Sequence, residues 1–288
     1  METPLQALTR LKNGPHPVIG CLPLYPPLEL FHSLELTPIV LWGLADIVPQ
    51  VADADRHVQN YACSVARRLT QFVISEWEEL LDGLFFYNAC DTLRNLPEIL
   101  REGLVDFGGL LHPQFRLHVP MLSPAQADAS GYLENGIEEL IYAMEKHYGI
   151  GFSEERFAGS VALYDRMREL CRQLEEAVAA GRMPFAEFCR LLTVTNFMAV
   201  NEQIVLLEST MEDIMERPAP GGNSAGLIVS GIMPPPSAVC EMMDQAGLRV
   251  AGNDIAFMHR AYARTPESWR DAADYYVRFY RDHFPCPT

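Results

Sequence analysis

Short apolar runs alternate with helical patterns over the first 130 residues. The runs that predict strands are residues 18–22, 37–43, 84–87 and 115–120. Near-continuous apolar runs of this length are typical of parallel strands that are buried on both faces. Helical patterns lie between them, near residues 26–36, 63–79 and 93–104. Because strands that alternate with helices form parallel sheets, the sequence predicts an α/β fold with a Rossmann-like first domain over residues 1–130.

Residues 131–217 have a helical pattern throughout. Helices are predicted near 131–148, 153–180 and 184–216. The second of them carries apolar residues three and four positions apart, which predicts a packing face. Its members are Val161, Tyr164, Met167, Leu170, Leu174 and Val178. Cys171 and Cys189 lie inside these helices, and we expect both to be core or surface thiols.

A stretch rich in Pro and Gly at residues 218–224 predicts an exposed linker. Beyond it the pattern is strand, helix and strand, at residues 227–230, 237–246 and 248–251. Two strands are few for an independent sheet. Residues 218–288 are therefore expected to form an incomplete second α/β domain after the helical segment 131–217.

The composition argues against some classes of binding partner. The chain has 22 Lys and Arg against 38 Asp and Glu, a formal net charge of −16, which argues against nucleic acid and anionic membrane surfaces. It has no apolar run long enough to span a membrane and no leader pattern, so a cytoplasmic location is expected. Its 7 Cys are odd in number and show no CxxC spacing, which favours reduced thiols over a disulfide framework.

Two cysteines stand out by their position in the pattern. Cys90 follows the apolar run 84–87 and precedes a helical pattern, so it is expected on the turn at the carboxyl end of a strand, where open α/β sheets bind ligands. Cys63 opens the preceding helix. The start of a helix favours a thiolate, so two such cysteines at adjacent turns are candidate ligands of one metal cluster. A buried free cysteine in a strand–helix turn remains the alternative.

These residues resemble the catalytic subunits, of the D-component type, of 2-hydroxyacyl-CoA dehydratases and benzoyl-CoA reductases. The resemblance covers about residues 17–260 and rests on segments in the family's order. They are Pro27–Leu30, Thr37–Gly43, Cys63-Ser64 with Arg67, Asn88–Arg94, Gly226–Gly231 and Gly247–Asp254. Family members continue past the point where this chain stops, and the family's third cluster cysteine lies in that part.

The resemblance implies a [4Fe–4S] cluster held by three protein cysteines, with one iron left open. Cys63 and Cys90 match two of these ligands, with sulfurs expected no more than about 7 Å apart across one cluster. Cys286 is the candidate for the third, although it does not match the family's position. The open iron would bind the carbonyl of an acyl-CoA thioester. An electron from an ATP-hydrolysing iron–sulfur activator protein would then start ketyl-radical chemistry.

Four further residues are candidates for the site. Glu29 matches an acidic residue of the family and His118 lies near the end of the fourth strand, so both are candidate catalytic residues. The alternatives are a charge at a helix start for Glu29 and a structural histidine for His118. Arg67 and Arg94 each follow a candidate ligand by four residues and are expected to offset cluster or phosphate charge. Surface salt bridges are the alternative.

Two classes of function remain open at this point. The chain is either a cluster-bearing lyase or oxidoreductase subunit of anaerobic metabolism, or a cluster-free relative that serves as a structural or regulatory partner. An incomplete second domain would leave an apolar sheet edge uncovered. We therefore expect the chain to form a homodimer or to pair with a related second subunit.

Overall fold

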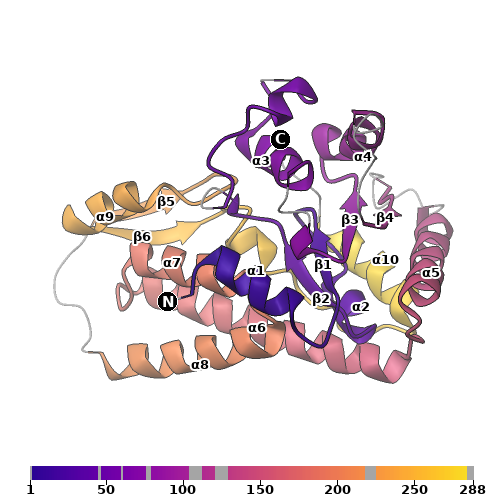
Figure 1. Ribbon diagram of the computed structural model, residues 1–288. Helices are drawn as coiled ribbons and strands as arrows, with labels where there is room; N and C mark the ends of the chain where they lie inside the picture. The colour runs from indigo at the N-terminus through magenta and orange to yellow at the C-terminus, as the bar shows by residue number, and fades with distance from the viewer. Residues whose placement is uncertain are drawn as a thin grey trace. The chain divides into compact units, whose positions relative to one another are not determined.

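The computed structural model describes residues 2–44, 47–59, 61–75, 79–103, 112–120, 129–217 and 225–283 (Figure 1). Packing divides the chain into two compact units. The first unit comprises Pro4–Val161 and the residues from Arg264 on, and the second comprises Ala162–Ala263 and the residues up to Thr3. The boundary falls inside α6 (Glu154–Ala179).

The first unit contains the predicted parallel sheet. Its strands are β1 (Val18–Cys21), β2 (Thr37–Val40), β3 (Gly83–Tyr87) and β4 (Gln114–Leu117). Its helices, besides the start of α6, are α1 (Pro4–Lys12), α2 (Leu28–Ser33), η2 (Ala54–Arg56), α3 (Ser64–Val73), α4 (Asp91–Gly103), α5 (Ala129–Tyr148) and α10 (Ala272–Asp282). The predicted α/β fold is confirmed.

The order of the strands is β2-β1-β3-β4, and all neighbouring pairs are parallel. The chain moves from β1 to β2 on one side and then to β3 on the other. The order therefore reverses between β1 and β3, and ligands of open α/β sheets bind outside the carboxyl ends of strands at such a point. Every residue of β3 is buried, because this central strand is covered on both faces.

Successive residues of a strand face opposite sides of the sheet. On one side Phe85 of β3 packs against Phe31 of α2, with 5.0 Å between the ring centres. On the other side Arg116 of β4 forms an ion pair with Glu98 of α4. Helices therefore cover both faces of the sheet, and α10 packs against α5 beside it (Figure 1).

The second unit contains a smaller sheet. Its elements, besides the rest of α6, are α7 (Phe185–Thr195), α8 (Val200–Glu216), β5 (Ala225–Val229), α9 (Ser237–Gln245), β6 (Leu248–Asn253) and η5 (His259–Ala261). Among the described residues β5 and β6 are its two strands, and they pair in parallel with a register shift between Leu227 and Ile228. The second unit thus has strands and helices as predicted, and its incompleteness stays a prediction.

The prediction of one helix over 184–216 is wrong, because the structure has two helices there. α7 ends at Thr195 and the chain turns so that Phe197 is fully buried. α8 then begins after Ala199, whose N–H donates to the side chain of Glu202 at 3.3 Å. The helical periodicity continues across the turn, so the pattern alone did not reveal the break.

The predicted helical segment 131–217 is shared between the two units, and α10 belongs to the first unit. The predicted three-part division of the chain therefore stays a prediction. The predicted linker 218–224 lies outside the described residues. Among those residues, no helix is both long and apolar enough to cross a membrane.

Candidate functional site

Both candidate cluster ligands lie at the start of a helix. Cys63 is the N-cap residue of α3, and its carbonyl accepts from the N–H of Arg67 at 3.1 Å. Cys90 directly precedes α4, and its carbonyl accepts from the N–H of Arg94 at 2.8 Å. Since α3 and α4 pack together, both thiols lie at the N-terminal ends of neighbouring helices, where partial positive charge favours anions.

These two cysteines are also the accessible ones among the described cysteines. Cys63 is exposed and Cys90 is half-buried. The remaining described cysteines, Cys21, Cys171, Cys189 and Cys240, are buried. Burial raises the pKa of the Cys21 thiol well above its usual value, which disfavours it as a ligand. Accessible sulfur is therefore concentrated at the ends of α3 and α4.

Asn88, two residues before Cys90, fixes the end of the sheet. Its side-chain amide donates to the carbonyl of Val119 at 2.8 Å, and its side-chain oxygen accepts from the N–H of Val119 at 2.7 Å. Asn88 and Val119 are both buried. The side chain of Asn88 thus bonds both backbone groups of Val119, as a neighbouring strand would. These bonds connect the segment after β4 to the turn that carries Cys90.

Tyrosine hydroxyls fix the loop after β1, at the other side of the switch point. The hydroxyl of Tyr87, at the end of β3, accepts from the N–H groups of Leu24 and Tyr25, the second at 2.7 Å. The hydroxyl of Tyr280 in α10 donates to the carbonyl of Tyr25 at 2.7 Å. Burial raises the pKa of Tyr280 well above its usual value, so this hydroxyl stays protonated as a donor.

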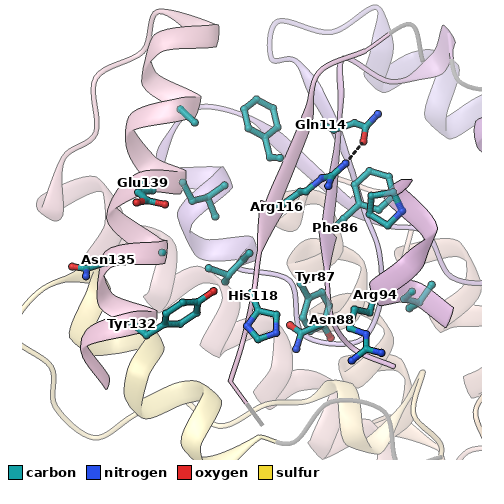
Figure 2. A pocket seen from close by; sticks show the side chains of 17 residues that line it. Phe86, Tyr87, Asn88, Arg94, Gln114, Arg116, His118, Tyr132, Asn135 and Glu139 are labelled. Atoms are coloured by element: carbon teal, nitrogen blue, oxygen red, sulfur yellow. Dashed lines mark hydrogen bonds between the residues drawn. The ribbon is translucent and has the colours of Figure 1, made fainter. Parts of the chain in front are cut away.

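A cavity of about 730 Å³ lies along the edge strand β4, between α4 and α5 (Figure 2). Asn88 and Arg94, which flank Cys90 in sequence, belong to its wall. The side chain of Tyr132 extends from α5 toward the end of β4, where His118 lies (Figure 2). The two rings meet edge-on, with 5.8 Å between their centres. The cavity therefore begins beside the Cys90 turn and has polar groups on three elements.

Charges in the cavity wall are partly compensated. Arg116 forms an ion pair with Glu98 and donates to the side chain of Gln114 at 3.2 Å (Figure 2). Arg94 contacts Asp91 at 3.1 Å, and its side chain is 56% exposed. An exposed guanidinium that pairs within its own helix can turn toward an anionic ligand. Arg94 is therefore the basic side chain of this wall that we would assign to ligand binding.

Glu29 lies in the protein interior, whereas a residue that contacts substrate is expected at a cavity wall or at the surface. It is fully buried in the first turn of α2. Its carboxylate accepts from the hydroxyls of Tyr275 at 3.3 Å and Tyr276 at 3.0 Å, both in α10. Burial, followed by the charge of Glu29, raises the pKa of Tyr276. The geometry is that of an interior hydrogen-bond network, and a catalytic role for Glu29 stays a prediction.

Arg67 has its charge balanced at the surface. Its guanidinium donates two hydrogen bonds to the carboxylate of Asp55, at 2.7 and 2.6 Å. These hydrogen bonds hold the pKa of Asp55 below its usual value.

Cys286 lies outside the described residues.

Several residues of the cavity wall were not predicted. Tyr132, Asn135 and Glu139 recur on α5 at spacings of three and four. That spacing was present in the sequence, but it predicts equally well a helix face that packs against the sheet. Only the position of α5 beside the open edge of β4 distinguishes the two.

The donor groups fit an iron–sulfur cluster in part. Cys63 and Cys90 are accessible thiols at the starts of two helices that pack together, and thiolates are the usual ligands of such clusters. Within the part of the chain that the structure describes, no group of three or more His, Cys, Asp or Glu side chains is gathered to hold a metal. Ligation of a cluster by Cys63 and Cys90 therefore stays a prediction, and the third thiolate that the resemblance implies is not among the described residues gathered at this place.

Comparison with known proteins identifies the family of this chain. The family model described as "2-hydroxyglutaryl-CoA dehydratase, D-component" matches residues 23–288. The chain belongs to this family. The match includes both cysteine turns, the strands β2, β3 and β4 of the parallel sheet, and the second unit from Ala162 to Ala263. The suspected family is therefore confirmed over most of the chain.

Three relatives of this D-component chain are named for their enzymes. The (R)-2-hydroxyglutaryl-CoA dehydratase subunit beta of Acidaminococcus fermentans is 23% identical over 91% of this chain and 68% of its own length. A benzoyl-CoA reductase subunit from Thauera aromatica is 21% identical, over 84% of this chain and 62% of its own length. The lactoyl-CoA dehydratase subunit beta of Anaerotignum propionicum is 21% identical, over 83% of this chain and 61% of its own length. The chain thus spans little more than three fifths of the latter two.

Proposed function

We propose that this D-component chain is a subunit of a 2-hydroxyacyl-CoA dehydratase-like or benzoyl-CoA reductase-like enzyme, and that Cys63 and Cys90 are ligands of a [4Fe–4S] cluster. The observation that carries the proposal is the placement of these thiols. Both are accessible and both precede the first turn of neighbouring helices. Relatives named as subunits of such enzymes support the reaction class.

The third thiolate would come from outside the described residues, from Cys286 or from a partner subunit. The names of the relatives describe subunits, which supports a related second subunit as partner. When bound, the cluster supplies a Lewis-acidic iron for a thioester carbonyl and a path for one electron. An ATP-hydrolysing activator protein would deliver that electron.

The side chains of this protein would bind and orient the acyl-CoA. The cavity along β4 has the size of a small-molecule site and begins beside Cys90. Arg94 would contact an anionic group of the ligand. His118 after β4 and Tyr132 on α5, which lie side by side in the cavity wall, would hydrogen-bond its polar groups. Asn88 would keep the segment after β4 in position while the ligand binds.

Iron and sulfide analysis of the anaerobically purified chain tests the proposal. We expect about four irons per chain in the wild type and a clear loss in both Cys63→Ser and Cys90→Ser. Cys171→Ala is the matched control, because Cys171 is buried in the interior of α6 and does not lie at the start of a helix. Full iron content in Cys90→Ser would contradict the assignment.

The same measurement separates the alternative function. A chain that binds no iron after anaerobic reconstitution, yet forms a stable complex with a related subunit, would be a cluster-free structural or regulatory partner. A chain that binds iron and requires both cysteines is the cluster-bearing subunit.

A further inference from the structure

Helices α7 and α9 of the second unit are held together by two polar contacts. The N–H of Ala186 in α7 donates to the carboxylate of Asp244 in α9 at 3.2 Å. One turn farther along α7, Arg190 forms an ion pair with Glu241 at 3.2 Å. α7 and α9 therefore run antiparallel along this contact, with residues 186 and 190 of α7 paired with residues 244 and 241 of α9. Residue 189 adjoins residue 190 on α7 and residue 240 adjoins residue 241 on α9, so both lie in the segments where the two helices pack.

Both of these positions are cysteines. Cys189 and Cys240 are buried, with exposed fractions of 7% and 0%. Burial first, and then the neighbouring Cys240, raises the pKa of the Cys189 thiol. Cys240 donates to the carbonyl of Pro235 at 3.3 Å. Neither thiol belongs to the site at the first sheet.

We propose that Cys189 and Cys240 form a peroxide-sensitive dithiol, which oxidises to a disulfide that links α7 to α9. Two observations carry the proposal: α7 packs against α9 (Ser237–Gln245) at these positions, and both thiols are buried there. The proposal is independent of the function proposed above.

The step needs one hydroperoxide as the oxidant. The Cys240 thiolate attacks a peroxide oxygen, an S–O bond forms, the O–O bond breaks, and the departing hydroxide takes up a proton. The Cys189 sulfur then attacks the Cys240 sulfur, so that an S–S bond forms and the S–O bond breaks. Two thiols lose two electrons and two protons in total, and hydrogen peroxide is reduced to two molecules of water.

Burial determines how the reaction proceeds. Cys240 has no exposed surface, and burial is the largest cause that raises the pKa of its thiol. Peroxide must therefore reach it through local opening of α9, a helix of 9 residues. We expect oxidation of the dithiol to be slower than oxidation of the exposed Cys63. Once formed, the disulfide fixes α9 against α7 and raises the apparent melting temperature of the chain.

Peptide mapping of the full chain tests the proposal. The reduced protein is treated with hydrogen peroxide, alkylated, digested with trypsin without reductant, and analysed by mass spectrometry. Trypsin separates the two thiols, because Met183–Arg190 carries Cys189 and Leu191–Arg249 carries Cys240. We expect these peptides to become linked, with the loss of two hydrogen atoms, and dithiothreitol to release them.

Variants assign the roles of the two sulfurs. In Cys189→Ala, dimedone should trap Cys240 as the sulfenic acid, and in Cys240→Ala, Cys189 should stay reduced. Cys171→Ala, which removes a buried thiol of α6, should leave the link unchanged. Circular dichroism confirms that each protein is folded. If the wild-type peptides are recovered separately while Cys63 is fully oxidised, the proposal is overturned, and this result does not depend on any variant.

Discussion

The amide of Asn88 is the polar group whose replacement gives the sharpest test of how the site is held. In Asn88→Ala the N–H and the carbonyl of Val119 both lose their partner. The two residues are 7% and 3% exposed, so water replaces that partner poorly. Each buried group left without a hydrogen bond costs about 1–3 kcal/mol. We expect Asn88→Ala to lower the free energy of unfolding by about 2–4 kcal/mol, allowing for incomplete additivity.

Asn88→Asp adds a dependence on pH. The carboxylate still accepts from the N–H of Val119, but its second oxygen faces the carbonyl of Val119 and repels it. Only the protonated carboxyl can donate there, so the pKa of the new side chain in the folded state rises above its unfolded value of about 3.9. Its stabilising contribution is therefore complete below about pH 4 and is lost as the pH rises through the folded pKa.

Urea unfolding at pH 7 and near pH 4 measures both effects, each relative to the wild type at the same pH. Asn95→Asp is the matched control. Asn95 is exposed on α4 and donates to the carbonyl of Asp91 at 2.8 Å, so the change should stay within about 0.5 kcal/mol. A loss below about 0.5 kcal/mol in Asn88→Ala, or the same deficit for Asn88→Asp at both pH values, would refute the reasoning.

Three further predictions test separate parts of the molecule. Tyr276→Phe removes a buried hydroxyl that donates to a carboxylate and accepts from a backbone N–H, so urea unfolding should show a loss of about 1–3 kcal/mol, against almost none for the exposed Tyr142→Phe. Arg94→Gln should weaken acyl-CoA binding about tenfold or more in calorimetry, whereas Arg101→Gln, on the same helix but outside the cavity wall, should not. Phe197→Ala should cost about 3–5 kcal/mol in unfolding, because Phe197 is fully buried at the turn between α7 and α8.

The local features of this protein could be predicted from its amino-acid sequence. The strands could be predicted because a buried parallel strand needs a continuous apolar run, and β3 is buried along its whole length. Cys63 and Cys90 could be placed at helix starts because each directly precedes a helical pattern in the chain, and the first backbone hydrogen bonds of α3 and α4 confirm it. The packing face of α6 followed from helical periodicity for the same reason, and Leu174 at its centre is fully buried.

The tertiary structure decided the features that depend on contacts distant in sequence. Glu29 contacts Tyr275, which is 246 residues away in the sequence. The periodicity of apolar residues cannot reveal such a pair. The turn at Phe197, the pairing of Asn88 with Val119, and the cavity between β4 and α5 likewise arise only when separate elements pack. Periodicity shows which face of an element is apolar, but it does not show which element will cover that face. Which residues become neighbours at each of these places therefore depends on how the elements pack.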